Sequence, residues 1–257
     1  MEISEWQDPK KQIIPRYWVN EKDLDSVLPR TQKWLIVFRD TTNVMTNSRN
    51  SIFTVIPRAT VGNTAPCLIT TLGTSYACGM LGNLNSFILD YVTRQKLGGA
   101  HMNFFIVRQL PVLPSSLYDT PTPWAPNMST KDWIKSRVLE LTYTAWELSE
   151  FAHDAGYDGP PFKWEEHRRF LLLSELDAAF FHLYGIKRDD VTYIMDTFPI
   201  VKRREELAYG EYRTKRVILE IYDEMAHVLQ TGHSYISRLN PPPADPRIAH
   251  VPITQAV

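Results

Sequence analysis

The pattern of apolar and polar positions divides the chain into a strand-rich first part and a helix-rich second part. Runs rich in β-branched and aromatic residues predict four strands, at Lys33–Arg39, Ser51–Arg58, Cys67–Thr71 and Asn103–Leu110. Between the third and fourth strands, from Gly79 to Leu97, the apolar positions follow i, i+3, i+4 spacing. This spacing predicts an amphipathic helix that ends at Gly98-Gly99.

A crowded group of prolines follows the fourth predicted strand. Five prolines lie between Pro111 and Pro126, a density that disfavours any regular element and predicts a linker. Beyond it the pattern is helical, and Ser129-Thr130-Lys131-Asp132 has the form of a helix N-cap. Helices are expected at 129–156, 164–184, 188–196 and 211–231, before a proline-rich end.

These elements predict an α+β chain, with a mixed-sheet domain followed by a mainly helical domain. The expected boundaries are a lead-in segment at 1–30, an α+β domain at 31–113, a proline-rich linker at 114–128, a helical domain at 129–232 and an extended tail at 233–257.

Composition limits the class of protein further. With 44% hydrophobic and 12% aromatic residues the chain has enough apolar material for a packed core. The longest apolar runs are far shorter than the roughly 20 residues that cross a bilayer, so we expect no membrane partner. No export signal opens the chain, which predicts a cytoplasmic location with Cys67 and Cys78 as buried free thiols.

Charge is distributed unevenly along the chain. Residues 31–113 carry seven basic and two acidic residues, Asp40 and Asp90, although the whole chain has a net charge of −1. A basic region beside an acidic one is typical of a polyanion-binding face joined to a part that does not touch the polyanion. Chance clustering of basic residues on a solvated face is the alternative.

The loop between the first two predicted strands holds the main candidate residues. It contains Arg, Asp, Asn and Ser with almost no apolar filler, and these side chains read base edges and phosphates. The DNA-contacting candidates, including those from two further polar segments near 57–64 and 94–103, are Arg39, Asp40, Asn43, Asn47, Arg49, Asn50, Arg58, Asn63, Lys96, His101 and Asn103. Ordinary solvent-exposed turns have similar compositions, and that alternative stays open for each segment.

Several other signals do not indicate a site. Asn240-Pro241-Pro242-Pro243 lacks the aromatic residue that ends the Asn-Pro-Pro-aromatic motif of amino-methyltransferases, and no glycine-rich cofactor loop precedes it. No phosphate-binding loop, metalloprotease or nucleophile-elbow motif occurs. Lys202-Arg203-Arg204 precedes Glu205-Glu206, which favours a solvated helix face over a DNA contact.

Three long phrases carry a family resemblance. FRDTTNVMTNSRNSIFTVIPRATVGNTAP, LGNLNSFILDYVTRQKLGGAHMNFFIVRQLPVLP and SELDAAFFHLYGIKRDDVTYIMDTFPIVKRREELAYGEYRTKRVILEIYDEM resemble the C-terminal target-recognition region of N6-adenine DNA methylases. The relevant methylases are the fused restriction–modification (type IIG) proteins and related phage-defence enzymes. The resemblance covers roughly Trp18–Met225, most of the chain.

The resemblance implies that this chain chooses the DNA site while a separate methylase domain or subunit transfers methyl from S-adenosylmethionine to adenine. The chain is then a C-terminal fragment or a separately encoded specificity subunit, with no cofactor of its own, no catalytic or metal-binding residues and double-stranded DNA as its partner. Alone it is not expected to be an enzyme. Two alternatives remain: a protein-interaction scaffold of the same system that does not bind DNA, and an unrecognised enzyme.

Overall fold

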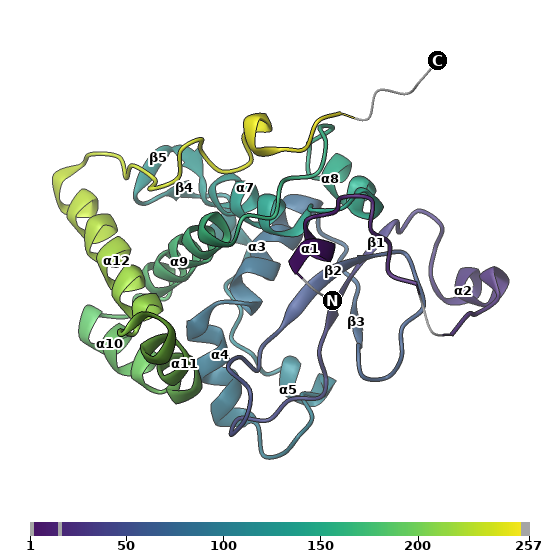
Figure 1. Ribbon diagram of the computed structural model, residues 1–257, viewed down its shortest axis with the longest axis horizontal. Coiled ribbons are helices and arrows are strands. Elements are labelled where there is room, and N and C mark those ends of the chain that lie inside the picture. The colour runs from purple at the N-terminus through teal and green to yellow at the C-terminus, as the bar shows by residue number, and fades with distance from the viewer. Residues whose placement is uncertain (1–2, 15–16, 253–257) are drawn as a thin grey trace.

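The computed structural model describes residues 3–14 and 17–252, and Figure 1 shows a small sheet beside a stack of helices. The fold is α+β with a mainly helical C-terminal part, as predicted. The first part contains α1 (Ile3–Trp6), α2 (Glu21–Val27), β1 (Trp34–Phe38), β2 (Phe53–Pro57), β3 (Cys67–Leu68), α3 (Thr74–Leu84), α4 (Phe87–Lys96) and α5 (Phe104–Val107).

The three-stranded sheet has the order β2-β1-β3, with β1 in the centre. Val37 of β1 pairs with Thr54 on one side and with Cys67 on the other, and both pairings are antiparallel. The prediction of a mixed sheet is therefore wrong. A parallel pair needs a long crossover connection, and the helices that follow β3 are not followed by a fourth strand of this sheet in the described residues.

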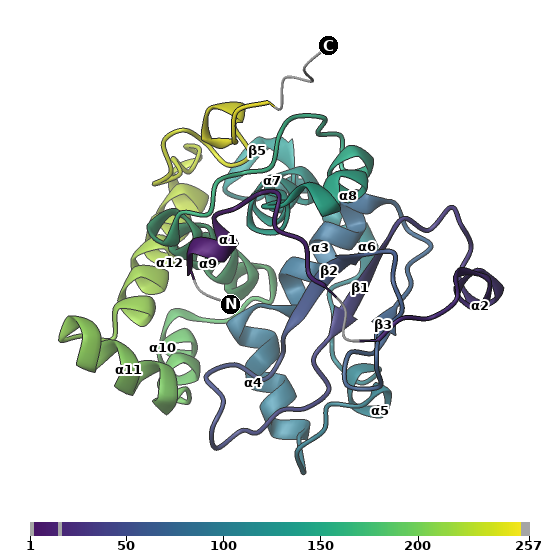
Figure 2. The same cartoon turned by 45° about the vertical axis from the view of Figure 1, so that its right-hand side comes forward.

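Strand β1 is buried on both faces, which explains why its sequence WLIVF lacks polar alternation. Successive side chains point to opposite faces of a strand. Ile36 and its even-numbered neighbours belong to the main core, whereas Leu35 and Val37 pack with Leu24 and Leu28, in and just after α2. Figure 2 shows α2 on the far side of the sheet from the helices.

The amphipathic pattern predicted for Gly79–Leu97 corresponds to two helices. The chain breaks between α3 and α4, where the Ser86 hydroxyl accepts a hydrogen bond from the Leu89 N–H at 3.4 Å and so caps α4. Gly82 lets α3 approach its neighbours closely, since a Cβ there would lie 3.2 Å from side-chain atoms of Ile134 and Phe180. The strand predicted at Asn103–Leu110 is wrong: Asn103 caps the short helix α5 instead.

The segment 114–128 is structured, so the prediction of an irregular linker is wrong. It holds α6 (Ser115–Tyr118), β4 (Pro121–Thr122) and the start of β5 (Ala125–Ser129), which pairs with β4. Pro114 is the N-cap of α6, and Pro121 and Pro126 lie in a two-stranded sheet, in which each strand is an edge strand that tolerates proline. Trp124 is completely buried and meets the Trp133 ring edge-on, with ring centroids 5.3 Å apart.

In the C-terminal part, the helices predicted at 164–184, 188–196 and 211–231 are present within a few residues, but the single helix predicted at 129–156 is wrong, because the chain leaves the helix after Thr142 and two shorter helices follow. The elements of this part are α7 (Thr130–Thr142), η1 (Trp146–Leu148), α8 (Ser149–Asp154), α9 (Glu166–Leu183), α10 (Arg188–Asp196), α11 (Pro199–Tyr209), α12 (Arg213–Thr231) and η2 (Pro246–Ile248). The Ser129 hydroxyl caps α7, as predicted. Helix α11 was not predicted. None of its side chains is buried, so its sequence has no periodic apolar face that would indicate a helix. None of the described helices is long and apolar enough to span a bilayer.

One hydrophobic core joins both parts of the chain. It contains side chains of β1, β2, α3, α4, α7, α9, α10 and α12, and α3 packs against α7 while α9 packs against α12. In Figure 1 these elements form successive layers from the sheet to α12.

The tail predicted as extended is held against this body. The buried Arg168 of α9 donates hydrogen bonds to the carbonyl oxygens of Pro241 and Pro242, at 2.8 and 3.0 Å. The Glu140 carboxylate accepts the Ala244 N–H at 2.8 Å. Residues 253–257 of the predicted tail, and Met1, Glu2, Pro15 and Arg16 of the lead-in, lie outside the described residues.

Candidate nucleic-acid interface

Three polar segments that are distant in the sequence meet at one end of the sheet. The Asp40 N–H donates to the Thr64 carbonyl at 3.0 Å, the Thr42 N–H to the Ala100 carbonyl at 2.9 Å, and the Met102 N–H to the Asp40 carbonyl at 2.7 Å. We call residues 39–50, 60–64 and 96–103 the three-loop surface. Its first and third loops form the lower end of the molecule in Figure 1, next to α4 and α5.

Five of the predicted contact residues are exposed on this surface: Asn43, Asn63, Lys96, His101 and Asn103. Two of these side chains also shape their own loops. The Asn43 side-chain oxygen accepts the Met45 N–H at 2.8 Å, and that of Asn103 accepts the Ile106 N–H at 3.2 Å. No side-chain partner of Asn63 or Lys96 is found in the described part of the chain. Their donors and acceptors therefore face solvent.

Asp40 and His101 form a pair across two of the loops. The His101 Nδ1 lies 2.5 Å from a carboxylate oxygen of Asp40, whose side chain is 14% exposed. A carboxylate in this position fixes the orientation of the imidazole, so the exposed ring edge of His101 has a defined direction. Thr41 and His101 are also joined as an isolated bridge between the loops.

Arg49 points inward. Its Nε donates to the Asp90 carboxylate at 2.7 Å, another guanidinium nitrogen donates to the Asn85 carbonyl, and the guanidinium lies 3.9 Å from the centre of the Phe87 ring. Its side chain is 23% exposed and that of Asp90 is fully buried. In this arrangement two guanidinium nitrogens of Arg49 bond within the protein and hold the loop, and less of the side chain is exposed to a ligand than is buried.

Asn50 lies deeper still and is completely buried. Its side-chain oxygen accepts the Thr42 hydroxyl at 2.6 Å, and its N–H donates to Asp90 at 3.0 Å. Asn50 has no surface to offer DNA here. It acts as an internal anchor of the loop.

Three further candidates are partly buried and have protein partners. Arg39 donates to the Arg49 carbonyl at 3.0 Å. The Asn47 side-chain oxygen, in the amide orientation that satisfies its neighbours, accepts from Arg39 at 3.1 Å and from the Asn43 N–H at 2.9 Å. Arg58 binds the Asp25 carboxylate and the Leu28 carbonyl, at 2.7 and 2.8 Å, and so ties β2 to α2 away from the loops.

Sequence reasoning missed Asp90, the buried carboxylate that holds the first loop through Arg49. Asp40 was a predicted contact residue, and in the structure it pairs with His101. Arg94 is a second anchor, since it donates to the Val44 carbonyl at 3.0 Å and to the Thr197 carbonyl at 2.7 Å. Burial lowers the pKa of Arg94. The rarity of acidic residues in a basic stretch was the signal available.

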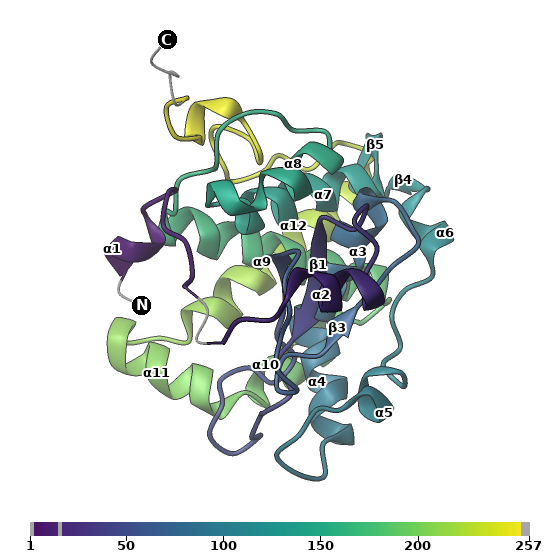
Figure 3. The ribbon, with the colours of Figure 1, turned by 90° about the vertical axis from the view of Figure 1, so that its right-hand side faces the viewer.

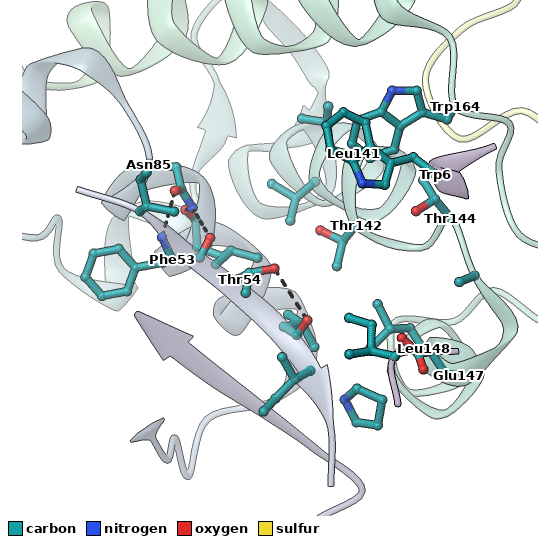
Figure 4. A pocket seen from close by; sticks show the side chains of 18 of the residues that line it. Trp6, Phe53, Thr54, Asn85, Leu141, Thr142, Thr144, Glu147, Leu148 and Trp164 are labelled. Carbon is teal, nitrogen blue, oxygen red and sulfur yellow. Dashed lines mark hydrogen bonds between the residues drawn. The ribbon is translucent and has the colours of Figure 1, made fainter. Parts of the chain in front are cut away.

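A large cleft lies elsewhere, between β2, α7, α9 and the N-terminal segment. Its volume is about 960 Å³. In Figure 4, Thr54 of β2 lies on one side of it and Leu141 and Trp164 lie on another. The Trp6 and Trp164 ring centroids are 5.0 Å apart at its edge. Arg49, Thr60 and Val61 of the three-loop surface also line the cleft, so the two adjoin there.

Burial shifts the pKa values of three ionisable groups that line the cleft, Asp177, Glu147 and Arg169. Burial raises the pKa of the Asp177 carboxyl to about 6, although the nearby Arg49 guanidinium acts to lower it. Burial also raises the pKa of Glu147 and lowers that of Arg169 to about 10. Asp177 has a structural partner, because it accepts the Phe87 N–H at 2.6 Å at the start of α4. The pKa shift of Asp177 is thus explained by packing under α4.

Chemically, the three-loop surface offers amide groups, an ammonium group and an oriented imidazole, which suit hydrogen bonding to base edges and phosphates. Within the described residues no three His, Cys, Asp or Glu side chains are grouped so as to hold a metal ion. No protein-family model, curated protein or solved structure matches this chain.

Proposed function

We propose that this chain is the target-recognition module of an N6-adenine DNA methyltransferase and that it binds duplex DNA through the three-loop surface. In this proposal the bases are read by exposed side chains such as Asn63 and His101, and Lys96 contacts a phosphate. Transfer of methyl from S-adenosylmethionine takes place on a separate methylase domain or subunit in the cytoplasm, where the target adenine is flipped out of the stack.

One observation carries the proposal. Segments near residues 40, 64 and 100 were each selected as polar candidates from sequence, and backbone hydrogen bonds join them into one surface. The antiparallel sheet order brings the first two segments to one end of β1, and the third is hydrogen-bonded to the first there, so one ligand can contact all three. The inner residues Arg49 and Asn50 fix the first loop to Asp90, and a fixed loop presents its outer side chains at lower entropic cost.

The test is selection of bound sequences from a randomised duplex pool, at low and at moderate salt. The full chain should enrich one motif that survives the higher salt. Asn63→Ala should lose the preference at one position of that motif, and Lys96→Ala should weaken binding to all sequences alike. Asn127→Ala is the matched control, because Asn127 is an exposed asparagine of β5, at the opposite end of the molecule in Figure 1.

A protein-docking scaffold is the second candidate, and one observation favours it. Apolar side chains of the N-terminal segment are strongly exposed, including Ile14 at 85% and Trp18 at 80%. Exposed apolar groups of this density mark protein interfaces. A chain that shows no duplex preference and only weak salt dependence would support docking over DNA recognition, since counterion release makes DNA binding strongly salt-dependent.

A further inference from the structure

Helix α11 lies directly beside the three-loop surface. Arg94 makes the connection, because its guanidinium donates both to the Val44 carbonyl in the first loop and to the Thr197 carbonyl just before α11. The guanidinium also lies 4.6 Å from the centre of the Phe198 ring. Figures 1, 2 and 3 agree that α11 and the loop at 39–50 are neighbours on one side of the molecule.

The helix presents unpaired positive charge. It has no buried residue, and both Arg203 and Arg204 are exposed with no ion pair to any other residue in the described ranges 3–14 and 17–252. Neither adjacent acidic residue forms an ion pair with Arg203 or Arg204 in the described residues. Glu205 accepts hydrogen bonds from the N–H and hydroxyl of Thr214, and Glu206 lies 4.0 Å from Lys202.

We propose that α11 is a phosphate-binding element and that Arg203 and Arg204 contact the DNA backbone beside the bases read by the three-loop surface. This inference rests on the proposed function and extends it to a second part of the chain. Phosphate contacts set the position and register of a recognition module on the duplex and carry no sequence information. Arg94 is then a positioning residue, which holds the phosphate-binding helix at a fixed offset from the loop.

The physical consequence is a defined salt dependence. Each cation that neutralises a phosphate adds about 0.9 to the slope of log K against log salt concentration. Removal of two such contacts should therefore lower the slope by about 1.8 and leave the preferred sequence unchanged. A role of α11 in base reading would change the motif instead, and a role in protein docking would change neither.

The experiment measures duplex affinity of the full chain at several salt concentrations. Arg203→Ala/Arg204→Ala should lower the slope by about 1.8, and Arg203→Lys/Arg204→Lys should keep it, because lysine also binds phosphate as a point charge. The control is Lys163→Ala/Arg247→Ala, which removes the same charge from the opposite end of the molecule. There the Lys163 N–H bonds the Ile248 carbonyl at 3.0 Å, next to the exposed Arg247.

The outcomes separate the two proposals. In one outcome the wild-type chain selects a motif and the double alanine variant keeps the wild-type salt slope. That outcome overturns the role of α11 and leaves target recognition intact. A variant that changes the selected motif also overturns phosphate binding by α11. A wild-type chain that binds no duplex at any salt concentration overturns both proposals. Far-ultraviolet circular dichroism of each variant verifies that the fold is retained.

Discussion

The pair formed by Arg49 and Asp90 provides the sharpest test of how the first loop is built. Arg49→Ala removes the cation that faces a completely buried carboxylate at 2.7 Å, together with the donor to the Asn85 carbonyl. Loss of one partner of a buried ion pair costs about 3–5 kcal/mol, because the remaining charge is left uncompensated. Arg49 keeps 23% of its side chain exposed, so we expect the lower end, about 3 kcal/mol.

Urea unfolding measures this free energy directly. With a slope of about 3 kcal/mol/M, a loss of about 3 kcal/mol moves the midpoint down by about 1 M. Asp90→Asn in the Arg49→Ala background removes the stranded charge and keeps an acceptor for the Asn50 N–H. The double variant should therefore be more stable than Arg49→Ala alone.

Arg203→Ala serves as the matched control, since this exposed arginine should change the unfolding free energy by less than about 0.5 kcal/mol. The reasoning is refuted if Arg49→Ala unfolds at the wild-type midpoint. It is also refuted if the folded variant keeps its stability but loses its base preference at one position, since Arg49 would then be a base-reading side chain.

Three further predictions concern the core, the tail and the cleft. Trp124→Ala should lower the free energy of unfolding by about 3–5 kcal/mol in one cooperative transition, as for any large core truncation. An unchanged stability would mean that the segment 114–128 is a linker after all. Arg168→Met should speed amide exchange across residues 240–249, because it removes both donors to the Pro241–Pro242 carbonyls and the cation that pairs with the buried Glu140, which accepts the Ala244 N–H; unchanged exchange in the tail would contradict this. Asp177 has a pKa raised from 3.8 to about 6, so its stabilising contribution is full below about pH 4 and is lost as the pH rises to about 6. Asp177→Asn should therefore gain about 3 kcal/mol relative to wild type over that window, and a stability difference that does not vary with pH would contradict the assignment.

The sequence was most informative where one local rule decides the structure. The strands β1 and β2 follow from their β-branched and aromatic residues, and the capping serine Ser129 marks the start of α7. The observed bounds of α10 equal the predicted ones, because the spacing of its apolar residues and the residues on either side of it indicate the same first and last positions. For these elements, local preference and tertiary packing act in the same direction.

The predictions that are wrong concern segments where distant contacts override local preference. Trp124 is drawn into the core by residues of α7 and α9, so a proline-rich stretch becomes ordered. The apolar run after Asn103 reads as a strand, yet the side chain of Asn103 caps a turn of helix. Helix α11 has no buried face and therefore no periodic signal.

For the candidate site, the residue types in the sequence located the polar segments but did not show which side chains face a ligand and which anchor a loop. Arginine and asparagine are equally suited to contact bases and to anchor a loop, so composition could not separate the exposed Asn43 from the buried Asn50. That distinction depends on Asp90, which lies 40 residues later in the chain. Only the folded arrangement shows which side chains are left for a ligand.

The two tiers of the loop between β1 and β2 have a consequence for protein engineering. Arg49 and Asn50 form an inner tier that bonds to Asp90 of α4, and Asn47 bonds within the loop itself. The side chains of Asn43, Met45 and Thr46 are exposed. A library randomised at the outer positions should retain the scaffold in most members, because no framework bond depends on those side chains beyond the Asn43 turn. The inner residues thus keep the loop in place while the exposed residues can be substituted, so new specificities can be sought without redesigning the fold.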